Sequence, residues 1–331
     1  MRPRVAIIYN DPSPSRYDAL AEAKAVLGVI DEVEAMYRAL TELGYFVVRV
    51  PLSPPLEQVR KRLKGLDTDL VFNLFEGFGG YPETEAVVAD MLSELGPAYT
   101  GCPGAALALA LDKARTKAVL EASGIDTPVY QVLTPETLNT FQLGYPCIVK
   151  PCGEDASHGL SEASLVHNFA SLAHQVTLVS QHYGGRALVE EFIDGREFNA
   201  TVLGNTVCTV LPISEIAYSL PPGMPKILTF AAKWESDSLY FKGTNAVCPA
   251  DIGADLERRI AETALAAFKL LGCQGYARVD MRLSTGGRLS VIEVNPNPDI
   301  SPSSGAVRQV KAAGMSYTQF AERILLLALE R

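Results

Sequence analysis

A β-hairpin close to the C-terminal end constrains the fold more than any other part of the sequence. Two strand-like runs, 273–283 and 288–298, flank the segment S-T-G-G at 284–287, whose glycines can supply the positive φ angles of a tight turn. Apolar and polar residues alternate along both runs, which is typical of strands with one buried face. The face expected to point into a core carries Val279, Met281, Ile292 and Val294.

The opposite face of this hairpin is charged. If the two ends of the segment 284–287 pair with each other, Arg278 lies opposite Glu293 and Asp280 lies opposite Val291. A shift of one residue would turn the charged residues toward the core, so the alternation supports this pairing. The charged face then consists of Arg278, Asp280, Glu293 and Asn295.

Two carboxylates and an amide on one face suit a hard cation. Mg²⁺ usually takes one or two carboxylates and completes its shell with water and phosphate oxygens. Arg278 beside them is placed to stabilise an oxyanion or a phosphoryl group in transfer. The alternative interpretation is an ordinary exposed sheet face with an Arg–Glu pair.

Length and charge limit the classes of function. A chain of 331 residues, 48% of them hydrophobic, can build about two or three domains with their own cores. The formal net charge is −9, and no basic stretch interleaves with aromatic residues. This argues against nucleic acid as the main partner, because neutralising phosphates needs clustered Lys and Arg. A few converging lysines would still allow an anionic nucleotide to bind.

The sequence gives no sign of a membrane segment or a disulfide framework. No run reaches the ~20 apolar residues that a span needs, and VAIIY near the N-terminus predicts a buried strand rather than a signal peptide. The six cysteines are scattered without a C-x-x-C pair, which predicts reduced thiols in a cytoplasmic protein. Ser316 and Gln319 have the spacing of a capping box that opens a final helix.

The first hundred residues alternate between strand and helix patterns. Strands are expected at 4–10, 45–52 and 69–75, and helices at 21–44, 56–66 and 84–96. The near-continuous apolar run of the third strand is typical of a parallel sheet buried on both faces. This predicts a small doubly wound unit with its binding loops at the carboxyl ends of the strands, where the glycine-rich segment 76–80 lies.

The remainder mixes helices with antiparallel strands. Helices are expected at 106–124, 165–182 and 255–272, strands at 128–133, 147–151 and 187–193, and two or three antiparallel strands within 196–216. The strand 187–193 could present backbone groups to an adenine ring, with Glu197 beside the ribose. The alternative is a plain edge strand.

Phosphate binding through a known glycine loop is not expected. The chain has no Walker A motif, and E-G-F-G-G-Y-P does not have the G-x-G-x-x-G spacing. Lys150 instead ends a strand before the small-residue loop 152–159, whose N–H groups could cover a triphosphate. Lys113 and Lys233 are ambiguous alone, because a lysine on a helix is usually solvated. His158, in the same loop, is either a pH-sensitive donor or a residue without a catalytic role.

Taken in order, these segments resemble the ATP-grasp superfamily. The chain carries D-K-A-R-T-K, I-V-K-P with its loop, V-E-E-F-I-x-G-x-E-F, A-K-W-x-S-D, G-Y-A-R-V-D and I-E-V-N-P-N-P. Within the superfamily it is most similar to the D-alanine–D-alanine ligases, and the resemblance covers nearly the whole chain. Each motif is weak alone, whereas the combination is specific.

The resemblance implies an α/β (α+β) three-domain ATP-grasp fold with an N-terminal doubly wound parallel sheet. The domains would be 1–104 on the substrate side, 105–190 as the central ATP-grasp domain and 191–331 as the C-terminal catalytic domain. ATP would bind between the last two, through Lys113, Lys150, Ser157, Glu190, Glu191, Phe192, Ile193, Glu197 and Lys233.

The same resemblance implies the other roles. Two Mg²⁺ ions, with Mn²⁺ as an alternative, would be bound by Asp280, Glu293 and Asn295. Arg278 and Lys233 would act in catalysis, and Ser303 or Ser304 would hold the second substrate's carboxylate. The reaction would convert a carboxylate to an acyl phosphate that an amine then attacks. The substrates would be a small-molecule carboxylate and an amino acid or amine, and the family suggests a homodimer.

Three positions depart from the ligases where those enzymes hold their first D-alanine. The expected glutamate, serine and tyrosine correspond here to Ala25, Ala156 and Trp234. The glycine-rich turn, GFGGYPETE, and the loop PNPDISPSSG are altered as well. We therefore expect a first substrate other than D-alanine, with Trp234 and His158 beside it.

Three alternatives stay open at this level. The chain could be a true D-alanine–D-alanine ligase of cell-wall synthesis in which these positions have drifted. It could be a nucleotide-binding regulatory protein without turnover, although such a protein has no need of both hairpin carboxylates. It could also be a kinase that stops at the phosphorylated product.

Overall fold

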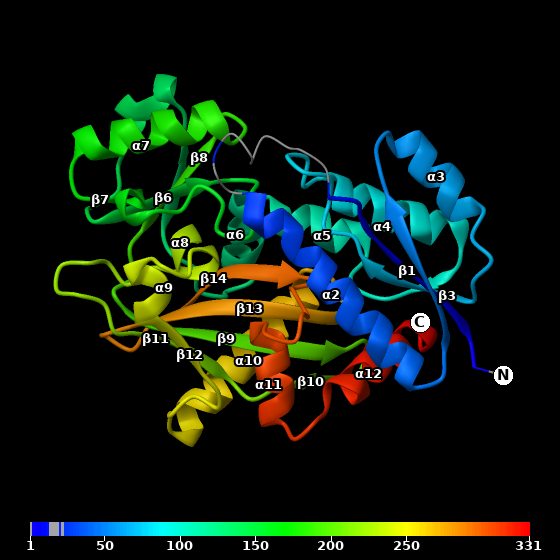
Figure 1. The fold of residues 1–331 in the computed structure, drawn as a ribbon. Coiled ribbons are helices and arrows are strands. Elements are labelled where there is room, and N and C mark those ends of the chain that lie inside the picture. Colours follow the sequence, from blue (N-terminus) through cyan, green and yellow to red (C-terminus); the bar gives the residue numbers. More distant parts are fainter. Residues whose placement is uncertain (1, 13–19, 21–22) are drawn as a thin grey trace.

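The computed structural model of the chain describes residues 2–12, 20 and 23–331, except for the side chains of 23–27. Within these residues the backbone forms three β-sheets with helices packed against them (Figure 1). One sheet is parallel and two are antiparallel, which confirms the predicted α/β (α+β) fold class. None of the helices in these residues is long and apolar enough to cross a membrane.

The first sheet is parallel and has the order β2-β1-β3-β4. Its strands are β1 (Arg4–Asn10), β2 (Phe46–Leu52), β3 (Leu70–Leu74) and β4 (Ala98–Tyr99), and its helices are α2 (Ala23–Glu42), α3 (Leu56–Lys64) and α4 (Thr84–Leu95). Every residue of β3 is buried, as expected of a strand covered on both faces. The glycine-rich segment follows β3, at the edge where ligands usually bind in such sheets.

The second sheet is antiparallel, with the order β5-β8-β6-β7. Its strands are β5 (Tyr130–Leu133), β6 (Cys147–Pro151), β7 (Leu165–Val166) and β8 (Ala187–Glu191), and α7 (Phe169–His182) packs on it. The helix expected from residue 165 begins later, because Asn168 caps α7 by accepting the N–H of Ser171 at 3.0 Å. The two residues of β7 pair with β6 instead.

The third sheet is the largest and has the order β12-β11-β9-β13-β14, with β10 paired to β9. Its strands are β9 (Gly195–Gly204), β10 (Cys208–Val210), β11 (Ser214–Tyr218), β12 (Thr244–Val247), β13 (Gly275–Ser284) and β14 (Leu289–Pro296). Helix α10 (Ala254–Leu270) packs its apolar residues against β9 and β13. Two short helices, α8 (Phe230–Trp234) and α9 (Leu239–Gly243), precede β12.

The helix expected over 106–124 is two helices, so that prediction is wrong. Helix α5 (Gly104–Leu111) ends at Asp112, and α6 (Lys113–Ala122) begins directly after it. Asp112 has an extended backbone, and its side chain accepts the N–H of Arg115 at 3.1 Å. An aspartate that can cap a new helix competes with continuing the old one. The break places Lys113 on the first turn of α6.

The hairpin β13–β14 has the predicted faces in a different register. Arg278 pairs with Asn295 and Asp280 with Glu293, so the expected pairs Arg278–Glu293 and Asp280–Val291 are wrong. The two registers differ by two residues at this point. Because strand side chains alternate with period two, the polar set stays on one face.

A β-bulge explains the change of register. The pairing shifts between Asp280 and Met281, where β14 carries one extra residue, Ile292. Ile292, expected in the core, lines the pocket on the other side of the sheet. The remaining predicted core residues, Val279, Met281 and Val294, are buried as expected.

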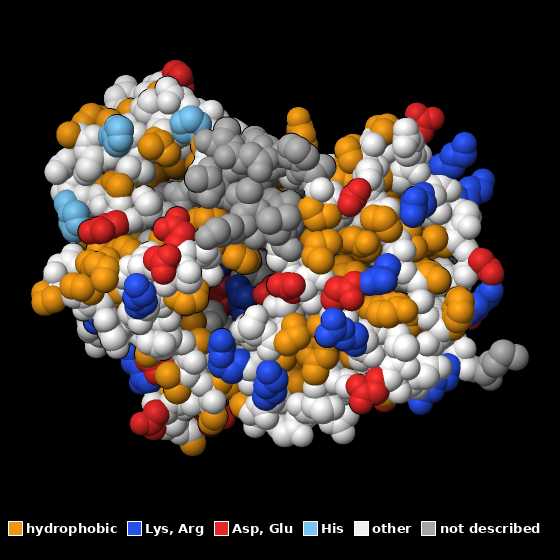
Figure 2. All heavy atoms as spheres, in the orientation of Figure 1, with side chains coloured by type: hydrophobic (Ala, Val, Ile, Leu, Met, Phe, Trp, Pro, Cys, Tyr) orange, Lys and Arg blue, Asp and Glu red, His pale blue; other side chains and the backbone are white. Residues whose placement is uncertain are grey.

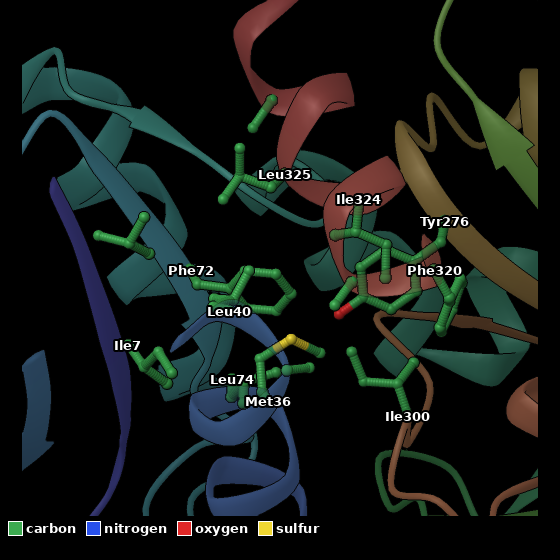
Figure 3. Close-up of a cluster of buried hydrophobic side chains, with 14 of the residues drawn as sticks. Ile7, Met36, Leu40, Phe72, Leu74, Tyr276, Ile300, Phe320, Ile324 and Leu325 are labelled. Atoms are coloured by element: carbon green, nitrogen blue, oxygen red, sulfur yellow. The ribbon is translucent and has the colours of Figure 1, made fainter. Parts of the chain in front are cut away.

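A shared core joins the two ends of the chain. The C-terminal helix α12 (Tyr317–Leu329), opened by the predicted Ser316–Gln319 capping box, packs along α2. Figure 3 shows Phe320, Ile324 and Leu325 of α12 facing side chains of α2 and the first sheet, with Tyr276 and Ile300 beside them. The domain boundaries inferred from the family resemblance stay predictions. Helix α11 (Gly305–Ala312) lies between β14 and α12 in the chain.

Candidate active site

An open pocket of about 840 Å³ lies between the second and third sheets. The structure brings together there twelve of the predicted site residues, from α6, β6, β8, β9, α8 and the hairpin and from the segments beside them: Lys113, Lys150, Ser157, His158, Glu190, Glu191, Phe192, Ile193, Glu197, Lys233, Asp280 and Glu293. In the space-filling view, acidic and basic side chains lie close together in the hollow near the middle of the visible face (Figure 2).

Glu190 on β8 lines the pocket and binds two lysines, of which Lys150 also lines it. Its two carboxylate oxygens lie 2.6 Å from Lys117 Nζ and 2.6 Å from Lys150 Nζ. Burial opposes ionisation of Glu190, but the two ammonium groups outweigh it and hold the pKa of Glu190 below its ordinary value. Lys117 was not among the predicted residues, although it ends the quoted D-K-A-R-T-K motif.

Glu293 on β14 is held in the same way from another side. Lys113 Nζ lies 2.8 Å from Glu293 Oε1. Burial raises the pKa of Glu293, whereas Lys113, and at longer range Lys150 and Lys233, lower it to about 2. Burial and the nearby guanidinium of Arg278 lower the pKa of Lys233. The pocket therefore pairs fixed negative charges with cations from separate elements.

Asp280 is the centre of a polar cluster on the third sheet. Arg278 donates to its two oxygens at 2.7 and 2.8 Å, and Asn295 Nδ2 donates at 3.0 Å. Asn199 of β9, the cross-strand neighbour of Asp280, donates at 2.7 Å and was not predicted. Burial opposes the charge on Arg278, but Asp280 and Glu293 raise its pKa, so the guanidinium stays charged.

The hairpin residues fit a divalent cation that shares its ligands with a phosphate. In the described residues, no group of three or more His, Cys, Asp or Glu could hold a metal alone. Asp280 and Glu293 are cross-strand neighbours, and Asn295 adds an amide on the same face. Two carboxylates and an amide suit Mg²⁺, which takes its remaining ligands from water and phosphate.

The far end of the pocket is organised by an arginine that sequence reasoning missed. Arg282, next along the site face of β13 after Asp280, is buried and donates to Glu197 Oε2 at 2.7 and 3.2 Å. Tyr218 donates to the same oxygen at 2.8 Å, and Arg282 also donates to the carbonyl of Ile193 at 2.8 Å. Glu197 Oε2 therefore has three donors, while Oε1 has none of them.

The loop after β6 is held by contacts to the segment around α8. Ala156 and Ser157 have φ angles of 47° and 64°, in the left-handed region that L residues rarely adopt. Ser157 Oγ donates to the carbonyl of Leu228 at 3.1 Å, and Trp234 Nε1 donates to that of Ala156 at 3.3 Å. The two departures Ala156 and Trp234 thus contact each other.

His158 is a packed residue in this arrangement. It is buried, and its ring lies 5.6 Å from that of Phe230, which lies 6.3 Å from Trp234. Helix α2 approaches the same stack, since a Cβ added at Gly28 would lie 3.5 Å from the Trp234 ring. Three aromatic rings therefore link the loop, α8 and the N-terminal helix.

The remaining predicted residues lie outside the pocket lining. Ser304 caps α11, accepting the N–H of Val307 at 3.2 Å, and Ser303 is exposed beside it. Arg278 and Asn295 donate to Asp280, which lines the pocket, and Trp234 donates to Ala156, the residue before the lining residue Ser157. The side chain of Ala25 lies outside the described residues.

Comparisons with known proteins agree with this geometry. The family model described as D-ala D-ala ligase C-terminus matches residues 119–326, more than half of the chain. An uncharacterised protein, y4sG, of Sinorhizobium fredii is 37% identical over 262 residues, covering 79% of this chain and 75% of that protein. A D-alanine–D-alanine ligase of Desulforudis audaxviator is 30% identical over 334 residues, covering 99% of each chain.

A solved structure extends the likeness to three dimensions. The crystal structure of D-alanine–D-alanine ligase from Bacillus anthracis has a TM-score of 0.77 to this chain, covering 99% of this chain and 97% of that one. The identity between them is 24%, so this likeness concerns the fold.

Proposed function

The chain belongs to the D-alanine–D-alanine ligase family of ATP-grasp enzymes, and from this premise we propose that it joins a carboxylate to an amine, with ADP and phosphate as by-products. We further propose that its first substrate is not D-alanine.

The charge arrangement of the pocket supports the use of ATP. Lys113, Lys150 and Lys233 face the carboxylates of Asp280 and Glu293 across one pocket. Lysines attract a triphosphate, whereas two carboxylates repel it unless a divalent cation lies between them. A pocket that carries both therefore suits a metal-bound nucleotide better than a free anion or a free cation.

We propose that separate groups of pocket residues bind the phosphates, the nucleoside and the metal ion. Lys113, Lys150 and Lys233 bind the phosphates, with the loop around Ser157 above them. Segment 190–193 binds the adenine. Glu197 binds the ribose through Oε1, because the three donors from Arg282 and Tyr218 bind its other oxygen, Oε2. Asp280, Glu293 and Asn295 would hold Mg²⁺, which would neutralise negative charge on the phosphate oxygens.

In the proposed reaction the substrate carboxylate attacks the γ-phosphorus, the bond to ADP breaks, and an acyl phosphate forms. The amine nitrogen then attacks the acyl carbon, its proton passes to solvent, and the C–O bond to the phosphate breaks, which releases phosphate and leaves the amide. The lysines keep the phosphates in line, and Arg278 stabilises negative charge on the acyl oxygen. Positioning and charge neutralisation supply most of the catalysis in such transfers.

The proposed change of first substrate rests on Ala156 and Trp234. The indole N–H of Trp234 donates to the backbone carbonyl of Ala156, and neither side chain carries the hydroxyl that the family pattern would offer to a small amino acid. A true D-alanine–D-alanine ligase remains the competing candidate, because the Desulforudis audaxviator relative carries that name.

An ADP-release screen over pairs of D- and L-amino acids and simple amines, with ATP and Mg²⁺, tests the function. We expect ADP release that requires both a carboxylate and an amine, with the amide detected by mass spectrometry. ADP release without amide would support a kinase, and nucleotide binding without ADP release a regulatory protein. Abundant D-alanyl-D-alanine at ordinary turnover would overturn the proposed first substrate.

A further inference from the structure

A second, smaller cavity lies where the first sheet meets the third. It occupies about 210 Å³, including its open mouth. Three carboxylates from separate parts of the chain line it: Glu32 of α2, Glu76 after β3 and Glu85 of α4. Asn73 of β3 and Tyr276 of β13 complete much of the wall.

The three carboxylates have few partners. Glu32 is buried, and its Oε1 accepts the N–H of Ile300 at 2.8 Å. Glu85 Oε1 accepts Asn297 Nδ2 at 3.3 Å, and the Glu76 side chain is exposed at the mouth. In the described part of the chain, none of the three glutamates forms an ion pair with Lys, Arg or His, in contrast to the paired carboxylates of the larger pocket.

Burial, and then the charges of neighbouring carboxylates, raise the pKa values of the three glutamates. Burial is the largest cause for Glu32, followed by the charges of Glu76 and Asp299. Burial and the charges of Asp155 and Glu76 raise the pKa of Glu85. Desolvation in the cleft, Asp299 and Asp155 raise that of Glu76 to about 8. Without a ligand, like charges oppose one another here.

Asn73 gives an independent sign of a ligand. Its side chain is 2% exposed, and its Oδ1 accepts the N–H of Phe75 at 3.2 Å, which fixes the orientation of the amide. Its Nδ2 has no hydrogen-bond partner in the described residues. Buried amide donors are almost always satisfied, so an unpaired one in a cavity wall points to a group that binds there.

The cavity adjoins the proposed catalytic face. Asn297, which binds Glu85, follows the proposed metal ligand Asn295 by two residues. The charge of Asp299, in the same loop, acts on both Arg278 and Glu76. A substrate whose carboxylate lies at Arg278 can therefore extend past Asp299 toward the three glutamates.

We infer that this cavity receives a cationic group of the carboxylate substrate, an alkylammonium or a guanidinium on its side chain. The inference rests on the proposed function and names its substrate class: amino acids with a basic side chain. Glu32, Glu76 and Glu85 accept the N–H groups of the cation, and a water molecule bound by the cation accepts from Asn73 Nδ2. A cation among these carboxylates replaces mutual repulsion by attraction.

A binding experiment that needs no turnover tests this inference. Isothermal titration calorimetry of the full chain compares lysine with norleucine and arginine with citrulline, each in the D and L forms. These pairs have similar size and differ in the charge at the end of the side chain. We expect at least one basic amino acid to bind at least tenfold more tightly than its uncharged counterpart.

Three variants tie this preference to the cavity. Glu32→Gln and Glu85→Gln should each reduce the preference for the basic amino acid at least tenfold. Glu76 is exposed at the mouth, so Glu76→Gln should fold even if the other variants do not, and it should reduce the same preference. The matched control is Glu83→Gln, an exposed glutamate at the start of α4, which should keep the wild-type preference.

The outcomes separate this inference from the proposed function. Equal binding of lysine and norleucine and of arginine and citrulline, or an equal loss in Glu83→Gln, would overturn the cavity's role even if ligation is found. A basic preference that the three variants remove would support the cavity even if no pair of substrates releases ADP. In an active enzyme the same preference should appear in kcat/KM, with the KM for ATP unchanged.

Discussion

At the scale of single residues, the pocket is a set of carboxylates whose charge depends on lysines from other elements. Glu293 is paired with Lys113, and Glu190 with Lys117 and Lys150. A sequence shows the carboxylates of a hairpin face but not these partners, because the pairing depends on how two sheets meet. Lys117 escaped prediction for that reason.

Replacing the hairpin carboxylates should remove turnover and leave the fold intact. Asp280→Asn and Glu293→Gln keep the size of each side chain and remove a proposed metal ligand. We expect ADP release to fall by about 10²-fold or more, since a lost charge-stabilising group commonly costs that much. Steady-state ADP release measures the effect, and circular dichroism shows whether the fold is kept. Near-normal activity in both variants would contradict the metal assignment.

Arg282 offers a test of how the nucleotide is positioned. Arg282→Met removes two of the three donors to Glu197 Oε2 and leaves a buried carboxylate with Tyr218 alone. We expect a loss of about 3–5 kcal/mol in the free energy of unfolding, as for other broken buried ion pairs. The KM for ATP should rise roughly tenfold while kcat changes little, because Arg282 acts through Glu197.

The matched control for this variant is Arg258→Met. Arg258 pairs with Asp255 and Glu262 on the exposed face of α10, where ion pairs contribute little. Urea titration and ATP saturation curves should be close to wild type for that variant. If Arg282→Met changed kcat as strongly as KM, the positioning role would be contradicted.

At the scale of elements, features that depend on a short stretch of sequence were predicted well, whereas the pairing of one element with another was not. The buried run of β3 and the capping box of α12 follow from composition and spacing, and the structure confirms both. The register of β13–β14 was predicted wrongly because a bulge at Ile292 leaves no mark in the alternation on either side of it. The break at Asp112 was missed because both flanking segments have high helix propensity.

The Asp112 cap is itself testable. Asp112→Ala removes the acceptor for the N–H of Arg115, and such losses typically cost about 1 kcal/mol of stability. Asp112→Asn keeps a capping acceptor and should cost less. Because Lys113 follows the cap directly, Asp112→Ala should also raise the KM for ATP, which ADP release would show. Equal stability of the two variants in urea would mean that the cap does not define the start of α6.

At the scale of the whole molecule, the first sheet contributes charge to a site that the other two sheets build. The three glutamates of the smaller cavity come from α2, α4 and the segment between β3 and α4, whereas the loop that closes it follows β14. No local pattern marks these residues, and their pKa values are raised by burial and by charges from distant parts of the chain. The shared core in Figure 3 packs α2 and the first sheet against α12 and the segment around Ile300. This part of the site could not have been derived from the sequence.

That arrangement predicts how stability depends on pH. The folded protein holds protons on Glu32, Glu76 and Glu85 at pH values where the unfolded chain has lost them, since their pKa values are raised in the fold. The folded state then binds more protons than the unfolded one, so the free energy of unfolding falls as pH rises above about 4.5. For Glu76 the fall ends near pH 8, its folded pKa. The charges of Asp155 and Asp299 contribute to these raised pKa values, Asp155 for Glu76 and Glu85 and Asp299 for Glu32 and Glu76.

Urea unfolding of the ligand-free protein between pH 5 and pH 8 measures this slope. Glu32→Gln and Glu85→Gln should each flatten the curve and stabilise the protein at pH 8, by up to about 1.4 kcal/mol for each pH unit by which the buried carboxyl is shifted. Glu83→Gln, with its side chain exposed, should leave the curve unchanged. If stability instead rose with pH in the wild type and fell in these variants, the three glutamates would be held by cations within the fold. The cavity would then have no need of a positively charged substrate. Whether the free energy of unfolding falls or rises with pH therefore tests the proposed substrate class independently of the ADP-release screen.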